Sequence, residues 1–144
     1  PKHSLDQTNT IRAIDAFQLF INKFPNSERK SEANELIEKL RAKLEIKSFK
    51  NAKLYFDLEY YNSAIVSLQN SLKEFPDSEY REELLFLILK SQFLYAENSI
   101  SARQKERYEK TVDYYYTLID GYPNGKFLKD AEQIYNKTVK YLNQ

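Results

Sequence analysis

The feature of this sequence that most constrains its fold is a phrase that occurs three times: an aromatic residue, a proline, and then Asn or Asp. The three copies are FINKFPNS at residues 20–27, SLKEFPDS at 71–78 and TLIDGYPNG at 117–125. Proline cannot extend the hydrogen-bond ladder of a preceding helix and disfavours helical geometry in the residue before it. Each phrase therefore predicts a helix that ends at Phe24, Phe75 or Tyr122, followed by the start of another helix.

The residues after each proline carry side-chain oxygens that can accept hydrogen bonds from the first N–H groups of a helix: Asn26 with Ser27, Asp77 with Ser78, and Asn124. A further helix start is predicted at Ser101, which has the capping-box spacing to Gln104. Asp77, Glu79, Glu82 and Glu83 gather where carboxylates complement a helix dipole, so a capping role explains them.

Between these stops the apolar residues recur at helical spacing, which predicts seven helices. Their apolar stripes cover residues 11–24, 33–44, 49–56, 64–75, 84–89, 108–119 and 127–141. The fifth helix, over residues 79–97, is apolar nearly all round and is predicted to be the most buried. The chain has only two glycines, whereas all-β and α/β folds need many in their turns. We therefore expect an all-α chain, an α-solenoid of antiparallel helix hairpins that forms a single domain over residues 1–144.

Residues 45–78 fit the 34-residue frame of a tetratricopeptide repeat. The frame places Ala52 and Ala64 where two helices touch, Tyr55 at the aromatic position, Leu68 at a large position and Pro76 at the closing proline. Small residues are needed at the contact because a larger side chain would force the helix axes apart. The flanking repeats are less regular, and no helix precedes residue 8 to complete the first one. We interpret the chain as the C-terminal part of a longer protein.

Composition excludes several classes of chemistry. The chain has no Cys and a single His3, so thiolate chemistry, Cys-based zinc sites and histidine-dependent triads are excluded. The 22 basic and 21 acidic side chains give a formal charge of +1, which argues against nucleic acid as a partner. We find no paired carboxylates, phosphate-binding loop or nucleophile motif, and no apolar run long enough to span a membrane. No catalytic, cofactor or metal site is expected.

The stretch from Pro25 to Pro76 closely resembles the BamD family of outer-membrane assembly lipoproteins, also described as YfiO- or ComL-type lipoproteins. The shared parts are a proline stop, an extra helix before the regular repeat, an aromatic turn and a second stop. They are carried here by Ala33, Leu40, Arg41, Leu44, Ala52, Tyr55, Tyr61, Ala64 and Ile65. The resemblance covers roughly residues 10–96, and the chain departs from the family at 97–107, where several residues are inserted.

The resemblance implies a non-enzymatic scaffold at the periplasmic face of the outer membrane, anchored by an N-terminal lipid on a Cys that this chain lacks. Its implied partners are the barrel-assembly subunit with periplasmic domains and other assembly lipoproteins. One alternative is another periplasmic tetratricopeptide adaptor that coordinates envelope proteins or binds a cell-wall component. A second alternative is a repeat array that regulates an attached enzyme domain.

Two sets of residues are candidates for partner binding. Lys39, Lys43, Lys47 and Lys50 are spaced to share one helix face, with Arg41 nearby at a position that the resemblance makes a candidate contact. They form either an electropositive strip for an acidic partner or a solvated face that contributes little.

The second set is aromatic: Tyr60 at a hairpin turn, and Tyr114 and Tyr116 on the sixth predicted helix. Three consecutive helical residues span about 200°, so Tyr114, Tyr115 and Tyr116 cannot all be buried. Tyrosine is favoured at protein interfaces because it buries a large ring and keeps a polar tip. Tyr61 and Tyr115 are interpreted as packing residues of the repeat.

Overall fold

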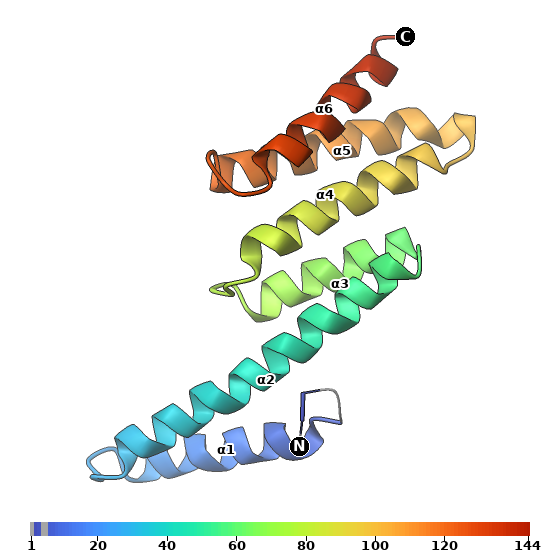
Figure 1. The fold of residues 1–144 in the computed structure, drawn as a ribbon. Helices are drawn as coiled ribbons and strands as arrows, with labels where there is room; N and C mark the ends of the chain where they lie inside the picture. Colours follow the sequence, from blue (N-terminus) through green and yellow to red (C-terminus); the bar gives the residue numbers. More distant parts are fainter. Residues whose placement is uncertain (1, 4–5) are drawn as a thin grey trace. The chain divides into compact units, whose positions relative to one another are not determined.

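The computed structural model describes residues 2–3 and 6–144, and this part of the chain consists of helices and turns (Figure 1). Six helices follow one another as antiparallel hairpins: α1 (Thr8–Lys23), α2 (Lys30–Asp57), α3 (Tyr61–Glu74), α4 (Arg81–Glu97), α5 (Ser101–Gly121) and α6 (Leu128–Leu142). The prediction of an all-α chain of tetratricopeptide-like hairpins is confirmed, with six helices in place of seven.

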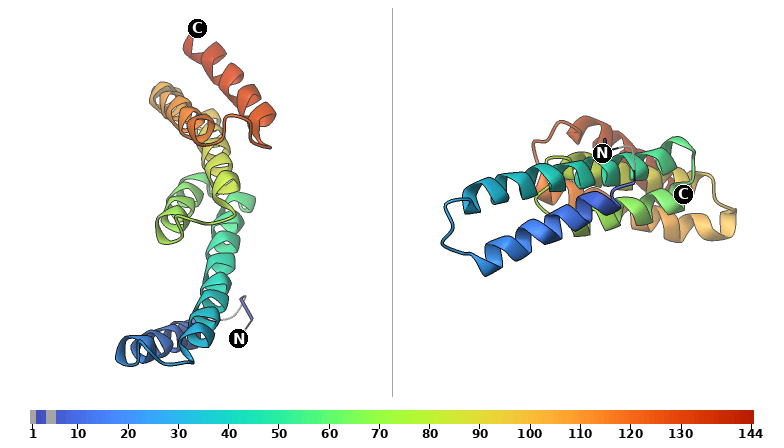
Figure 2. Two further views of the ribbon diagram at one scale, coloured as in Figure 1. Left: turned by 90° about the vertical axis from the view of Figure 1, so that its left-hand side faces the viewer. Right: turned by 90° about the horizontal axis from the view of Figure 1, so that it is seen from below.

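The difference in number comes from α2. The sequence predicts separate helices with apolar stripes over residues 33–44 and 49–56, but α2 runs without interruption from Lys30 to Asp57 (Figures 1 and 2). No Gly or Pro occurs in this stretch, so every residue can supply the backbone N–H that continues the ladder. The boundary that the repeat frame suggests at residue 45 therefore has no helix breaker to enforce it.

The chain forms two compact units, Pro1–Ser48 and Phe49–Gln144. In the first unit, α1 packs against the N-terminal part of α2. Ile21, Ala33 and Ile37 are buried at this contact, and Ile14, Phe17 and Phe20 cover them. The spacing of these residues at three and four positions is what places them on facing sides of the two helices.

Helix α4 lies at the centre of the second unit, and its six consecutive residues 84–89 are all buried. One side of α4 packs with α2 and α3: Leu84, Leu87 and Ile88 against Phe49, Ala52, Ala64, Ile65 and Leu68. The other side packs with α5 and α6: Leu85, Phe86 and Leu89 against Leu118 and Ala131. The prediction that this helix is the most buried element is confirmed, because ten of its residues are buried.

The tetratricopeptide frame places the small residues correctly. Ala52, Ala64 and Leu68 have no exposed surface, so α2 and α3 approach closely at the two alanines. The predicted aromatic position behaves differently, because Tyr55 keeps 42% of its surface exposed.

All three predicted helix stops are confirmed. Phe24, Phe75 and Tyr122 directly follow the last residues of α1, α3 and α5, and each donates its N–H to the carbonyl four residues earlier. After the first two stops, a serine accepts from the backbone two residues on. Ser27 Oγ accepts from the N–H of Arg29 at 3.2 Å, and Ser78 Oγ accepts from the N–H of Tyr80 at 3.0 Å.

The third stop has Gly125 where the others have serine, and a distant side chain supplies the acceptor. Glu82 Oε1 of α4 accepts from the N–H of Phe127, two residues after the glycine, at 3.4 Å. A Cβ on Gly125 would collide with this same oxygen, so the glycine makes room for the carboxylate. The predicted capping role of Asn124 is wrong, because α6 begins without a cap from its own loop.

The predicted capping box at Ser101 is also wrong. Ser101 is the first residue of α5, and no side chain caps that helix start. Gln104 turns instead to the end of α4, where its Nε2 donates to the carbonyls of Ala96 at 3.3 Å and Glu97 at 3.2 Å. Its Oε1 accepts from the Tyr141 hydroxyl of α6 at 3.1 Å, so Gln104 links three helices.

The substitution Glu82→Ala is expected to lower the free energy of unfolding by about 1 kcal/mol, the usual net contribution of one hydrogen bond. Adding Gly125→Ser is expected to recover most of this loss, because a serine hydroxyl then occupies the place that Ser27 and Ser78 take in the other turns. Urea unfolding of the single and double variants measures both effects. A double variant no more stable than Glu82→Ala would contradict the assigned role of Glu82.

Candidate functional site

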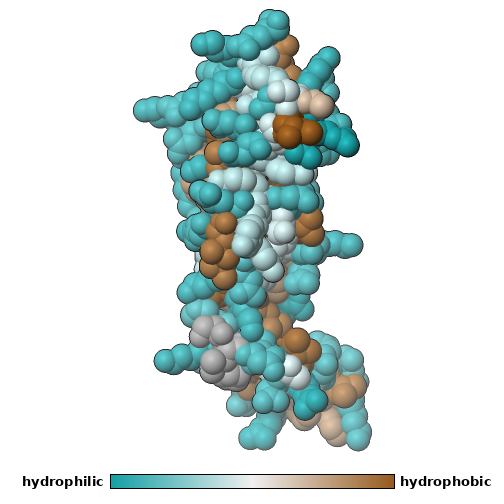
Figure 3. All heavy atoms as spheres, turned by 90° about the vertical axis from the view of Figure 1, so that its right-hand side faces the viewer, coloured by the Kyte–Doolittle hydropathy of each residue, from teal (hydrophilic) through white to brown (hydrophobic). Residues whose placement is uncertain are grey.

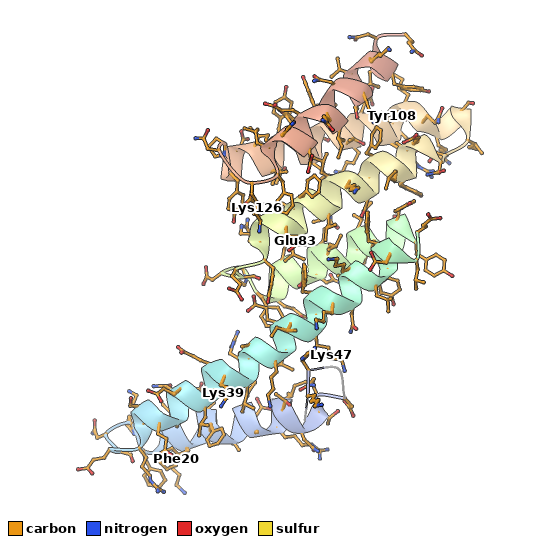
Figure 4. The ribbon with its side chains drawn as sticks, viewed as in Figure 1. Phe20, Lys39, Lys47, Glu83, Tyr108 and Lys126 are labelled. Carbon is orange, nitrogen blue, oxygen red and sulfur yellow. The ribbon has the colours of Figure 1, made fainter. Side chains whose placement is uncertain are left out.

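The predicted basic strip lies on α2, and helix geometry separates Arg41 from the lysines. Lys39, Lys43 and Lys47 follow at intervals of four residues, so about 80° of arc contains all three. Arg41 points about 160° away from Lys39 and Lys43 by the same geometry. Figure 4 shows Lys39 and Lys47 along this helix. The three lysines therefore form one side of α2 in the first unit, which we name the lysine face, and Arg41 lies on the other side.

The surroundings of the lysine face are mixed. Lys39 is exposed, while Lys43 and Lys47 are half-buried. The pKa of Asp6 lies below its ordinary value because the hydroxyl and N–H of Thr8 both donate to its carboxylate, and Lys47 adds a smaller attraction. Lys47 therefore interacts electrostatically with Asp6, an acidic group of its own unit.

The predicted member Lys50 belongs to the second unit and is exposed. Its neighbour Lys53 forms an ion pair with Glu83 of α4 at 3.9 Å and lies 6.0 Å from the centre of the Phe49 ring. Glu83 is labelled on α4 in Figure 4. In the second unit, part of the basic charge of α2 is therefore used for packing against α4.

The predicted tyrosines lie at different depths. Tyr60 precedes the first residue of α3 and is 61% exposed. Tyr114 is half-buried, and its hydroxyl accepts a 2.8 Å hydrogen bond from Gln69 Nε2 of α3. The Lys110 ammonium lies 5.2 Å from its ring centre. Tyr114 therefore links α5 to α3, and Tyr60 is the more accessible of the two.

Tyr116 belongs to an aromatic group that bridges α5 and α6. The rings of Tyr115 and Tyr135 stack with their centres 4.4 Å apart, and the Tyr116 and Tyr135 hydroxyl oxygens are 3.2 Å apart. Tyr116 is 49% exposed. Residues 115, 116 and 135 form what we name the tyrosine group. The sequence indicates Tyr116 but not its partner, because the two lie on different helices.

Two phenols of the tyrosine group, Tyr115 and Tyr116, have pKa values above the ordinary tyrosine value. The hydrogen bond with Tyr135 is the main cause that raises the pKa of Tyr116, and Asp120 adds to it. Burial is the main cause that raises the pKa of Tyr115, and Glu132 adds to it. At neutral pH both hydroxyls are therefore protonated and can donate to a partner.

The substitution Tyr135→Phe is expected to shift the pKa of Tyr116 down towards the ordinary tyrosine value of about 10, because the hydrogen bond is lost. A folded-state pKa above the unfolded value contributes stability that is present below pH 10 and is lost as the pH rises through the folded pKa. The variant should therefore lose less stability over that range. NMR titration of tyrosine ¹³Cζ resonances measures the pKa.

Tyr60→Phe is the control for this titration, because it removes a phenol that is not part of the tyrosine group. A Tyr116 pKa that is unchanged by Tyr135→Phe would contradict the assigned hydrogen bond.

The described residues contain no group of three or more His, Asp or Glu side chains placed to hold a metal ion. None of the helices in this part of the chain is long and apolar enough to cross a membrane. Hydrophilic residues cover most of the face displayed in Figure 3, and hydrophobic residues appear there in small separate groups. What these surfaces offer is charge and phenol groups for contact with other molecules.

Comparison with models of known protein families shows to which family the chain belongs. The profile of the YfiO family, described as outer membrane lipoprotein, matches residues 2–107 of this chain. The chain belongs to the YfiO family of outer membrane lipoproteins. The resemblance read from the sequence is thereby confirmed, and the match includes the inserted stretch 97–107. No curated protein matches the chain.

The family match ends within α5, so the lysine face and Tyr60 lie inside it and the tyrosine group lies beyond it.

Proposed function

We propose that this chain is a non-enzymatic, protein-binding scaffold of the machinery that assembles β-barrel proteins in the outer membrane. The observation that carries the proposal is membership of the YfiO family of outer membrane lipoproteins. In the full protein, a lipid on an N-terminal Cys holds the scaffold at the periplasmic face of that membrane. The helices themselves contribute surface complementarity.

The architecture supports a binding role. Repeated helix hairpins bury one face of each helix against the next and leave the remaining faces for partners. In this chain the helix surfaces that remain accessible to partners include the lysine face, Lys50, Tyr60 and the tyrosine group. Lysine and tyrosine suit different parts of an interface, since charge steers the encounter and phenol rings supply buried area.

The proposed partners are the barrel-assembly subunit with periplasmic domains and other assembly lipoproteins. The lysine face suits an acidic surface on such a partner, because three ammonium groups on one side of α2 attract carboxylates. Arg41, on the other side of the same helix, is close in sequence but is not expected to reach the same surface. This separation allows a matched comparison within one helix.

The triple variant Lys39→Glu, Lys43→Glu and Lys47→Glu is expected to reduce capture of the barrel-assembly subunit at least tenfold. Arg41→Glu is the control, and it should change capture by less than twofold. The assay is a pull-down of the tagged chain against detergent-solubilised envelope from its source, with bound proteins identified by mass spectrometry. Circular dichroism checks that each variant keeps its helix content.

The other possible outcomes distinguish the barrel-assembly scaffold from another periplasmic adaptor, and a binding role of the lysine face from simple solvation. Equal capture by the triple variant would assign the lysine face to solvation only, while the scaffold role would stand. Capture of a different envelope protein, with no barrel subunit, would favour another periplasmic adaptor and overturn the proposal.

A further inference from the structure

A polar pocket of about 560 Å³ opens in the second unit, and no member of the tyrosine group lines it. Its walls come from the turn between α2 and α3 and the first residues of α3, from the end of α4 with the turn that follows, and from one residue of α5. The lining residues are Glu59, Tyr60, Tyr61, Asn62, Ser63, Tyr95, Asn98, Ser99 and Arg107. Every one of them is polar or aromatic, and the volume lies in the range of small-ligand sites.

Arg107 is the cation of this pocket, and it is held in place. Its guanidinium carbon lies 4.0 Å from the centre of the Tyr95 ring. Its Nη1 donates to Ser99 Oγ, and that hydroxyl in turn donates to the carbonyl of Tyr95. A guanidinium that is stacked and hydrogen-bonded in this way has little conformational freedom left to lose when a ligand binds.

The main chain around Arg107 is fixed as well. Its carbonyl accepts from Gln92 Nε2 and from Thr111 Oγ1, both at 3.0 Å. Gln92 is 94% buried, since only 6% of its surface is exposed. The position of the guanidinium is therefore set by the packing of α4 against α5, before any ligand arrives.

Arg107 is half-buried. Neither the ion pair of Lys53 with Glu83 nor that of Arg103 with Glu106 involves Arg107, and no carboxylate of the described residues pairs with it. Glu59, the acidic residue of the lining, is exposed to solvent. A partly desolvated guanidinium gains most from a ligand that presents a planar, bidentate acceptor.

The other lining groups suit the same acceptor. Tyr60, Tyr61, Asn62 and Ser63 can all donate hydrogen bonds. Burial is the main cause that raises the pKa of Tyr61, with Glu59 and Glu97 adding to it, so its hydroxyl remains a donor. The rings of Tyr60 and Tyr61 can cover the apolar part of a peptide beside the acid group.

We propose that this pocket binds a carboxylate of a protein partner, with Arg107 as the anion-binding group and Tyr60, Tyr61 and Asn62 as its surroundings. The site deepens the scaffold role above by giving the chemistry of one contact. It also gives a function to the stretch 97–107, which places Ser99 and Arg107 at the wall.

Three blocked tripeptides test the proposal by NMR titration of the ¹⁵N-labelled chain. Acetyl-Gly-Glu-Gly-amide carries a side-chain carboxylate, acetyl-Gly-Gly-Gly a terminal one, and acetyl-Gly-Gln-Gly-amide has none. At least one carboxylate peptide is expected to shift the Arg107 Nε–H and Ser99 amide signals, with at least tenfold higher affinity than the glutamine peptide. Whichever acid binds better tells whether the partner offers a side chain or a chain end.

Arg107→Gln should weaken the carboxylate peptide at least tenfold. The matched control is Arg103→Gln, one turn earlier on α5, which removes an exposed arginine paired with Glu106 and outside the pocket lining. It should change the affinity by less than twofold.

Equal shifts by the glutamine and acidic peptides, or equal losses in the two variants, would overturn the assignment. The comparison of peptides on the unaltered chain decides the matter even if Arg107→Gln does not fold. Because isolated peptides are used, a negative result would leave the envelope pull-down, and the scaffold proposal, unaffected.

Discussion

The burial of α4 is the constraint on which the second unit depends. Six consecutive apolar residues, 84–89, point in all directions around a helix, so the helix must be covered on opposite sides. The tail of α2 and α3 cover one side, while α5 and α6 cover the other. Each buried leucine of this kind contributes on the order of 2 kcal/mol by leaving water. The polar features of the unit are arranged around this helix. At its start, Glu82 accepts from the N–H of Phe127, the residue before α6, and Glu83 pairs with Lys53. Its end carries Tyr95 and the turn that holds Arg107.

Much of the fold could be predicted from the sequence because its strongest signals are local. The three prolines end helices through their own backbone chemistry, and apolar spacing identifies buried faces such as those of Ala52 and Ala64. The errors have a different origin. The expected break before residue 49 came from a repeat frame and not from a helix breaker, so α2 continues through it. The hydrogen bond from the Phe127 N–H to Glu82 joins residues 45 positions apart, and no local pattern indicates such a contact.

For the candidate surfaces too, the sequence predicts which residues of one helix lie together, but not which residues of different helices meet. Helical spacing places Lys39, Lys43 and Lys47 together, and the same spacing, applied to Arg41, separates it from them. The tyrosine group combines residues of α5 and α6, so the sequence indicates Tyr116 as a candidate but not its contact with Tyr135. Nothing in the sequence indicates Arg107 as a binding residue except its place in an inserted stretch. Its proposed role depends on its contacts with Tyr95 and Ser99, which the packing of α4 against α5 creates.

If the proposed scaffold role holds, the full protein supports assembly of β-barrels in the outer membrane. This role is tested by depletion of the protein in its source organism, followed by measurement of folded barrel proteins through their heat-modifiable electrophoretic mobility. The folded fraction in isolated outer membranes is expected to fall several-fold on depletion and to be restored by the unaltered gene. An unchanged folded fraction, in cells from which the protein has been removed, would contradict the proposed role.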